Sequence, residues 1–166
     1  ANGITLNDKS NITYQNLNFN ASDVVSNSIT AITGSAENTT VTSNGFDNFG
    51  GTTVSVTATN STTGPQSLEI TSNTFTGDSS GAIDVAAGAA GSGDTVTIDG
   101  NTITQTGGTA AVALSGTTNS GPVGQADITS NEIEGGEGSA PGISLNTENE
   151  VDIDSGSINA TQGGIN

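Results

Sequence analysis

Carboxylates are the side chains of this sequence that could carry out acid–base or metal chemistry. The chain has 166 residues, with 17 acidic side chains, one basic side chain (Lys9), no His and no Cys. Without Cys it can form neither a disulfide framework nor a thiolate metal site. The formal net charge of −16 argues against nucleic acid as a partner, because neutralising phosphates requires Lys and Arg. An anionic membrane or an acidic polysaccharide would be repelled by the same charge.

Asp127, Asp152 and Asp154, together with Glu69, are the candidates for such chemistry. Paired carboxylates can hydrolyse a glycosidic bond, and clustered carboxylates can bind Ca²⁺. We expect the three Asp residues to lie close together on the outer surface, as a solvated acidic face, a weak Ca²⁺ site or a catalytic pair. The sequence favours the solvated face, because Trp is absent and Tyr14 is the only Tyr, which leaves no aromatic platform for a sugar.

An eight-residue phrase that occurs six times must position these acids. In the copy from Leu68 to Phe75 it reads apolar, polar, apolar, two small polar residues, Asn, any residue and Phe. The Asn position falls at residues 17, 44, 73, 101, 131 and 156, in steps of 27, 29, 28, 30 and 25. A fixed phrase at a nearly fixed period indicates a repeat architecture.

Each copy must stack on the next, because one copy alone cannot bury its apolar face. Parallel pairing in register then puts equivalent positions in columns about 4.8 Å apart. Two internal apolar columns are predicted: Tyr14, Val41, Ile70, Ile98, Ile128 and Ile153, and Phe19, Phe46, Phe75, Ile103, Ile133 and Ile158. The outward position four residues before the Asn puts Asp127 beside Asp152. Because Glu69 and these acids interrupt the Thr residues of that column, we do not expect a regular ice-binding Thr face.

A third internal column contains Asn44, Asn73, Asn101 and Asn131, with Leu17 and Gly156 at its ends. Asn tolerates left-handed backbone geometry, and stacked Asn side chains hydrogen-bond to one another. We interpret this column as a structural ladder that fixes each bend, and not as a ligand site.

A second alternating segment follows each phrase after a Gly- or Ser-rich turn. It ends at Val56, Val85, Leu114 or Leu145, 12 to 14 residues after the Asn position, and in the first copy Ile29 takes this place. No helical period persists along the chain. The predicted fold class is therefore all-β, a right-handed parallel β-helix (solenoid) of about six coils with 25–30 residues each. The handedness follows the rule for parallel crossovers. We expect one domain over residues 1–166, without obvious caps.

The phrase V-x-I-x-x-N-x-[F/I], a turn and then I-x-V resembles the repeat of right-handed, pectin-lyase-like β-helices over roughly residues 4–165. That fold hosts lyases, hydrolases, phage tailspikes and adhesins. If the chain were a pectate lyase, the resemblance would imply a catalytic Arg and a calcium site of Asp residues. If it were a polygalacturonase, the resemblance would imply clustered Asp with His and basic residues. This chain has no Arg and no His. It therefore resembles the surface-protein or adhesin type, which implies no catalytic residue and no cofactor beyond the Ca²⁺ considered above.

Asn-x-Ser/Thr sequons occur at five positions: Asn11, Asn20, Asn38, Asn60 and Asn159. Such tripeptides arise by chance in a chain rich in Asn, Ser and Thr. They are candidate glycosylation sites if the protein is exported through a glycosylating compartment.

The two ends of the chain suggest how it associates. Ile4 and Leu6 near the start and Ile165 near the end fall at about the same phase of the coil. A terminal coil exposes unpaired N–H and C=O groups, so the last coil of one chain could receive the first strand of the next and form a filament. Alternatively, neighbouring coils of a longer protein cover both ends.

Together these features predict a non-catalytic structural or adhesive extracellular module at the cell surface. It would be a rod that stacks head-to-tail into a fibre or forms part of a long surface protein, with glycans or cell surfaces as further partners. The alternative is a carbohydrate-binding or carbohydrate-degrading β-helix on a cell or phage surface. No apolar run reaches the roughly 18 residues that a membrane span needs, so we expect no membrane insertion.

Overall fold

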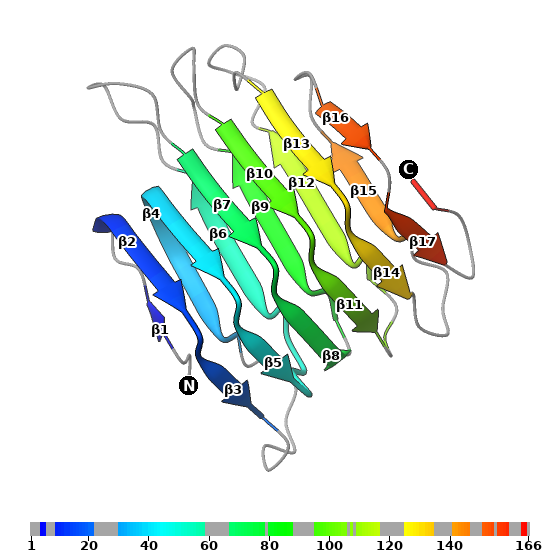
Figure 1. Ribbon diagram of the computed structural model, residues 1–166, viewed down its shortest axis with the longest axis horizontal. Coiled ribbons are helices and arrows are strands. Elements are labelled where there is room, and N and C mark those ends of the chain that lie inside the picture. Colours follow the sequence, from blue (N-terminus) through cyan, green and yellow to red (C-terminus); the bar gives the residue numbers. More distant parts are fainter. Residues whose placement is uncertain are drawn as a thin grey trace.

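The described part of the chain is a stack of short parallel β-strands without helices. The computed structural model describes residues 4–5, 9–21, 30–58, 67–78, 80–87, 95–105, 107, 109–116, 125–134, 141–146, 151–154, 156–159 and 164–165. Figure 1 shows the strands side by side, with the N-terminal strands at one end of the stack and the C-terminal strands at the other. No helix of the described residues is long and apolar enough to cross a membrane.

The strands form three ladders, which we call A, B and C. Ladder A contains β1 (Ile4–Thr5), the first part of β4 (Ile32–Thr42), β6 (Val54–Ala58), β9 (Ile83–Ala87), β12 (Val112–Gly116) and β15 (Ile143–Asn146). Ladder B contains β2 (Lys9–Gln15), the second part of β4, β7 (Ser67–Thr71), β10 (Thr95–Asp99), β13 (Gln125–Thr129) and β16 (Val151–Asp154). Ladder C contains β3 (Asn18–Asn20), β5 (Gly45–Asp47), β8 (Thr74–Asp78), β11 (Thr102–Gln105), β14 (Glu132–Glu134) and β17 (Ser157–Asn159).

Ladders A and B belong to one 11-stranded sheet because β4 runs through both, and ladder C is a separate six-stranded sheet. Ladder C takes one strand from each copy of the phrase. Every pairing is parallel, so a residue pairs with its equivalent in the next coil, as Ile70 does with Ile98. The predicted all-β parallel solenoid is confirmed.

Alternation along each strand separates the core from the solvent. In β7, Leu68 and Ile70 are buried whereas Glu69 is exposed. Such period-two burial arises because successive side chains of a strand point to opposite faces. The β-branched residues that dominate the inward positions suit this pleated, half-buried surface.

The two apolar columns lie in the core, and their burial varies along the stack. Val41, Ile70 and Ile98 have no exposed surface, whereas Tyr14 and Ile153 at the ends are partly buried. In the second column Phe46 stacks on Phe19 and Phe75 with ring centroids 5.1 and 4.9 Å apart. The inner members of both columns, Val41, Ile70, Ile98, Ile128, Phe46, Phe75, Ile103 and Ile133, are at most 2% exposed, and the end members Phe19 and Ile158 are partly buried.

The second-strand residue of the first copy was assigned incorrectly. Register pairing aligns Val56 with Gly34 and Val54 with Ile32, so Gly34 holds the position that the sequence assigned to Ile29. Ile29 itself lies outside the described residues. Gly34 comes 17 residues after Leu17, whereas the corresponding separation in the next copy is 12. A longer connection in the first coil therefore shifts the strand along the sequence.

The left-handed residue at each bend is the one before the ladder Asn, and not the Asn itself. Ser43, Ser72 and Ser130 have φ values of 56°, 56° and 53°. Gly100 takes this place in another coil, with φ of 63°. Gly100 adopts this conformation without a steric cost, whereas each Ser is held in it against the cost that its Cβ imposes. The Asn that follows is then free to turn its side chain into the stack.

Candidate functional site

The Asn column is a continuous ladder of hydrogen bonds through the core. Asn73 donates from its backbone N–H and its Nδ2 to Asn101 Oδ1, at 2.9 and 3.0 Å. Its Nδ2 also donates to the Val41 carbonyl in the preceding coil, at 2.9 Å. Asn44 and Asn101 repeat the pattern toward Asn73 and Asn131, respectively. Each inner side-chain oxygen therefore satisfies donors from the coil before it.

Asn44, Asn73, Asn101 and Asn131 are between 1% and 3% exposed. Buried amides of this kind require partners, since a buried unpaired polar group costs about 1–3 kcal/mol. Asn44 Oδ1 accepts from the Leu17 backbone N–H at 2.9 Å, and Asn131 Nδ2 donates to the Ile98 carbonyl at 2.8 Å. The geometry is that of a structural ladder, with no ligand-facing amide in its interior.

The ladder is interrupted at both ends of the stack. Leu17 holds the Asn position of the first coil and is 41% exposed. Gly156 holds it in the last coil, where an added Cβ would overlap the backbone oxygen of Asn131. No described residue supplies Asn131 with the side-chain acceptor that the inner ladder members have. The end coils therefore differ from the inner ones in a core position.

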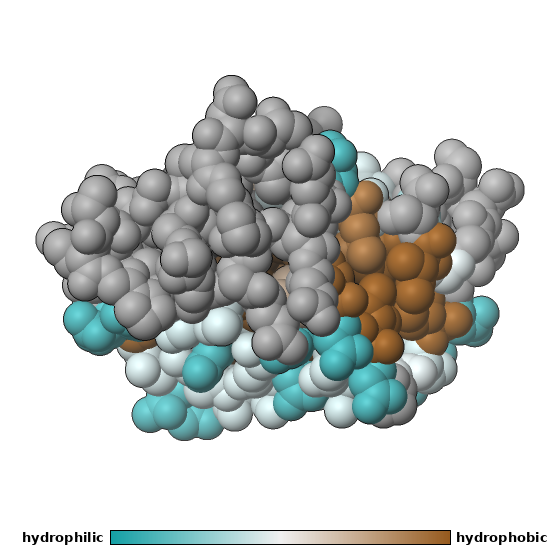
Figure 2. All heavy atoms as spheres, turned by 90° about the horizontal axis from the view of Figure 1, so that it is seen from above, coloured by the Kyte–Doolittle hydropathy of each residue, from teal (hydrophilic) through white to brown (hydrophobic). Residues whose placement is uncertain are grey.

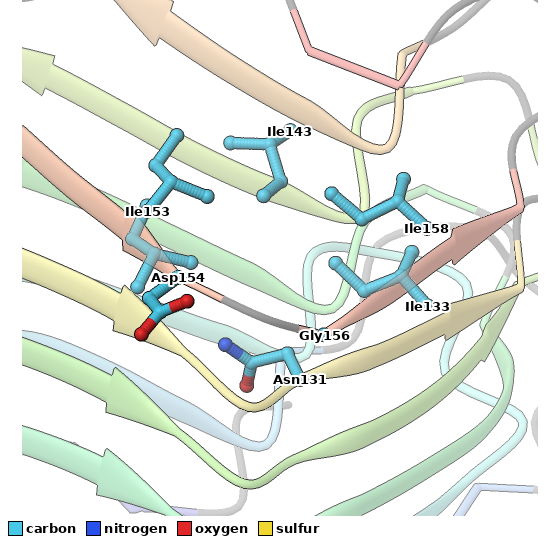
Figure 3. Close-up of a pocket in the computed structure, with 8 residues that line it drawn as sticks. Asn131, Ile133, Ile143, Ile153, Asp154, Gly156 and Ile158 are labelled. Carbon is cyan, nitrogen blue, oxygen red and sulfur yellow. The ribbon is translucent and has the colours of Figure 1, made fainter.

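A small apolar pocket lies beside Gly156, at the C-terminal end of the solenoid (Figure 3). Ile133, Ile143, Ile153 and Ile158 surround it in the close-up, with Asn131 and Gly156 at its base. The full lining is Ile128, Asn131, Ile133, Ile143, Ile153, Asp154, Gly156 and Ile158. Figure 2 shows exposed apolar atoms on the side where Figure 1 places the C-terminal strands.

The outward column contains the candidate acids in the register that the phrase predicts. Glu69 pairs with Thr97, and Asp127 pairs with Asp152. Asp154 pairs with Thr129 and not with another acid. Glu69 accepts a hydrogen bond from Thr40 Oγ1 at 3.2 Å, so its carboxylate is hydrogen-bonded to the neighbouring strand on the outer surface.

The described residues contain no group of three or more His, Cys, Asp or Glu side chains placed to hold a metal ion. Ca²⁺ takes six to eight oxygen ligands, many more than the two carboxylates of Asp127 and Asp152 provide. Asp127 is partly buried and Asp152 is exposed, and the two residues pair on neighbouring strands. This geometry favours a solvent-facing acidic surface over a calcium centre.

Asp84 is an acid that sequence reasoning did not select. It lies on β9, partly buried, and pairs with Ser55 on one side and Ala113 on the other. Burial raises the pKa of the Asp84 carboxyl above its ordinary value of 3.8, because a low dielectric disfavours the charged form. Its neighbours in the ladder carry no compensating charge, and nothing in the repeat pattern indicated this desolvation.

The sequons lie in different surroundings. Asn11 and Asn159 are exposed, and Asn20 is exposed but donates from Nδ2 to Asp47 Oδ2 at 2.8 Å. Asn38 is partly buried, and its Oδ1 accepts from the Ser67 backbone N–H at 3.1 Å. Asn60 lies outside the described residues. Asn11 and Asn159 are thus the accessible positions, whereas a glycan on Asn38 would disturb a contact between coils.

The predicted assembly residues lie at opposite ends of ladder A. Ile4 pairs with Ile32 at the first rung, and Ile165 forms a single bridge to Ile143 at the last. Ile165 is 51% exposed, and Leu6 lies outside the described residues. Because the two ends share the same phase of the coil, Ile4 of the next copy and Ile165 would fall on the same rung of an uninterrupted stack.

Comparisons of the chain with protein-family models, curated proteins and solved structures found no match. The parallel β-solenoid fold therefore stands on the structure alone. The finer assignment to a pectin-lyase-like or adhesin type, and any function, belong to the proposal that follows.

Proposed function

We propose that this protein is a non-catalytic structural or adhesive module of the extracellular space or cell surface. It acts as a rigid rod that stacks head-to-tail into a fibre or forms part of a long surface protein. The observation that carries the proposal is the pair of open ends. Among described strands, β2 and β3 pair on one side only, and so do β16 and β17.

Open strand edges recruit further strands, because they present a row of unpaired N–H and C=O groups. The strands of the first and last coils run in the same direction and have the same three-ladder arrangement. A contact between the last coil of one chain and the first coil of another joins two different surfaces and is therefore heterologous. A heterologous contact that does not close on itself produces a filament. The partly exposed apolar side chains of Tyr14, Phe19, Ile153 and Ile158 at the two ends would be covered by such a contact.

The interior supports a mechanical role. The Asn ladder and the Phe stack connect one coil to the next through the core. The outer face is polar and acidic, with Thr, Glu and Asp in register. Such a surface keeps a rod hydrated, and its net charge of −16 disfavours lateral clumping.

Sedimentation velocity of the 166-residue chain over a range of concentrations tests the proposal, with negative-stain electron microscopy of the same samples. We expect species that grow with concentration and appear as unbranched rods. A stable monomer at every concentration would contradict stacking. Intact-mass measurement of native material tests the extracellular part, since a glycan on Asn11 or Asn159 would demonstrate export, and an unmodified mass would remove that support.

The alternative is a carbohydrate-binding or carbohydrate-degrading β-helix, and the pairing of Asp127 with Asp152 is the observation in its favour. Adjacent strands lie about 4.8 Å apart, and retaining glycosidases use two carboxyl groups about 5–5.5 Å apart. A reducing-end assay on a panel of neutral glycans, with Asp127→Asn as the control, tests this alternative. Release of reducing ends that Asp127→Asn abolishes would replace the structural proposal.

A further inference from the structure

The two interruptions of the Asn column have complementary shapes. At the first coil, Leu17 adds an apolar side chain that is 41% exposed. At the last coil, Gly156 adds no side chain, and an apolar pocket lies beside it (Figure 3). We propose that Leu17 of a second copy of this chain inserts into the pocket beside Gly156. The inference rests on the proposed function, because it assigns the specific contact of the head-to-tail junction.

The lining of this small pocket is mainly apolar and suits contact with an aliphatic side chain. Five of its eight lining residues are Ile, contributed by β13, β14, β15, β16 and β17. Ile153 and Ile158 are only partly buried in the isolated chain, whereas their equivalents Ile128 and Ile133 are buried. An inserted Leu would remove this remaining apolar surface from water, which is the main driving force for association.

Gly156 is required where it stands. A Cβ at this position would overlap the Asn131 backbone oxygen and approach the Asn131 carbonyl carbon and amide nitrogen. The last coil can therefore bring its backbone against Asn131 only with glycine here. Gly156 therefore has no side chain that could cover the apolar residues lining the pocket.

The register of a continued stack brings Leu17 to Gly156. Tyr14 precedes Leu17 by three residues and Phe19 follows it by two, and Ile153 and Ile158 have the same spacing around Gly156. Placing Tyr14 of the second copy on Ile153 and Phe19 on Ile158 continues both apolar columns. Parallel pairing in that register aligns Leu17 with Gly156 without further adjustment.

Charges at the two ends favour this orientation. The last coil presents the exposed acids Asp152 and Asp154, and the first coil presents the neutral exposed residues Thr13 and Gln15 at the equivalent positions. Lys9, the only basic residue of the chain, also lies on β2 of the first coil. Two C-terminal ends facing each other would oppose acids with acids, which is destabilising for directly paired strands.

Ladder A requires one exchange at the junction. In the register above, Ile4 of the second copy takes the rung next to Ile143 that Ile165 occupies in the isolated chain. β1 is held by two register pairs, Ile4 with Ile32 and Thr5 with Thr33, whereas Ile165 is held by a single bridge and is 51% exposed. The more weakly held Ile165 is therefore the segment that is displaced.

Sedimentation velocity of four forms of the full chain tests the proposal: wild type, Leu17→Asp, Leu17→Met and Thr102→Asp. Thr102 is exposed on β11 in the middle of the stack, so its variant is the matched control for added charge. Full burial of an exposed Leu side chain corresponds to roughly a 10- to 100-fold change in an association constant; Leu17 is 41% exposed and contributes part of this, and the charge buried in Leu17→Asp adds the cost of its desolvation. We expect Leu17→Asp to weaken association by at least this factor, with Leu17→Met and Thr102→Asp close to wild type.

The outcomes separate this inference from the proposed function. If the wild-type chain is a monomer at all concentrations, this inference and head-to-tail stacking are both overturned, and of the proposed function only the module of a longer surface protein remains. If wild type assembles and Leu17→Asp assembles equally well, stacking stands and the assignment of Leu17 is overturned. Circular dichroism verifies that Leu17→Asp is folded, and Leu17→Gln replaces it if it is not.

A mixing experiment adds a directional signature. Leu17→Asp keeps the pocket, so it can accept Leu17 of a wild-type chain but cannot donate its own. Added at one tenth of the wild-type concentration, it should shorten wild-type assemblies, and equal addition of Thr102→Asp should not. Unchanged lengths would contradict a one-sided contact. Deletion of residues 163–166 should leave association unchanged or strengthen it, and loss of association would overturn the register.

Discussion

The middle coils and the end coils of this solenoid contain the same eight-residue phrase. In the described structure a middle coil has a neighbouring coil on both sides, and an end coil has one on a single side. Asn73 in the middle is 1% exposed and hydrogen-bonds to both neighbouring coils. At the same position of the end coils stand Leu17, which is 41% exposed, and Gly156, beside an apolar pocket. The same phrase therefore gives a closed core in the middle and partly exposed apolar side chains at the ends.

This difference predicts that substitutions in the middle coils and in the end coils have different effects. In the middle, each coil contacts its neighbours, and stability is approximately a sum over repeats and their interfaces. The end coils of the described structure have a neighbour on one side only, so we expect a substitution there to change stability less than one in the middle.

Removing a middle rung of the Asn ladder should have the largest effect on stability. In Asn101→Ala, the buried Asn73 N–H loses its acceptor and the Ile70 carbonyl loses its donor. Two unpaired buried groups at about 1–3 kcal/mol each lower the free energy of unfolding by about 2–6 kcal/mol. Urea denaturation measures this change. Asn18→Ala, at an exposed Asn of the first coil, is the control and should be close to neutral.

Truncating the apolar column should be nearly as costly in the middle and much less costly at the end. Ile98 has no exposed surface, so Ile98→Ala should lower the free energy of unfolding by about 2–5 kcal/mol. Ile153 in the same column is only partly buried, and Ile153→Ala should cost clearly less. Equal losses of unfolding free energy in the two variants, measured by urea denaturation, would show that the end coil is as well covered as the middle. That result would contradict the difference between middle and end coils.

Asp84 provides a smaller effect that depends on pH. Its pKa is raised by burial above the ordinary 3.8, so the folded chain binds the proton more tightly than the unfolded chain does. The charged carboxylate is therefore unfavourable above its folded pKa, and this penalty fades as the pH falls toward 3.8. Asp84→Asn should raise the melting temperature at neutral pH and lose its advantage in acid. Glu134→Gln, at an exposed acid, is the charge-matched control, and equal shifts in both variants would contradict a role for burial.

The smallest effect is expected from calcium. Net charge of −16 makes self-repulsion sensitive to ionic strength, so NaCl should raise the melting temperature of the chain. CaCl₂ at the same ionic strength should add little, because no group of three or more potential metal ligands occurs in the described residues. A calcium-specific rise that Asp152→Asn removes would instead demonstrate a cation site at the Asp127–Asp152 pair.

Sequence reasoning succeeded where the contact partner of a residue lies one period away. The phrase aligned Ile70 with Ile98 and Asp127 with Asp152, and these residues pair in the structure. It failed where the length of a connection decides the alignment. Gly34, and not Ile29, pairs with Val56, because more residues separate Leu17 from Gly34 than separate Asn44 from Val56, and the repeat does not report the length of a connection.

The bend illustrates a second limit. Asn was expected to adopt the left-handed conformation, but Ser72 and Ser130 do so, one residue before the ladder. Both residue types are common in turns, so composition alone cannot assign the positive φ to one of two adjacent positions. The backbone of the structure assigns it to the residue before the Asn, and the Asn amide lies in the stack.

The repeat in the sequence was sufficient to predict the fold class, the parallel register and the composition of the internal columns. It could do so because in a solenoid each coil contacts only its neighbours, and a one-dimensional period then encodes the three-dimensional contacts. The exposure of the column members, the desolvation of Asp84 and the pocket beside Gly156 became evident only from the three-dimensional contacts. These properties depend on whether a neighbouring coil is present and how closely its backbone approaches, and neither is written in the period.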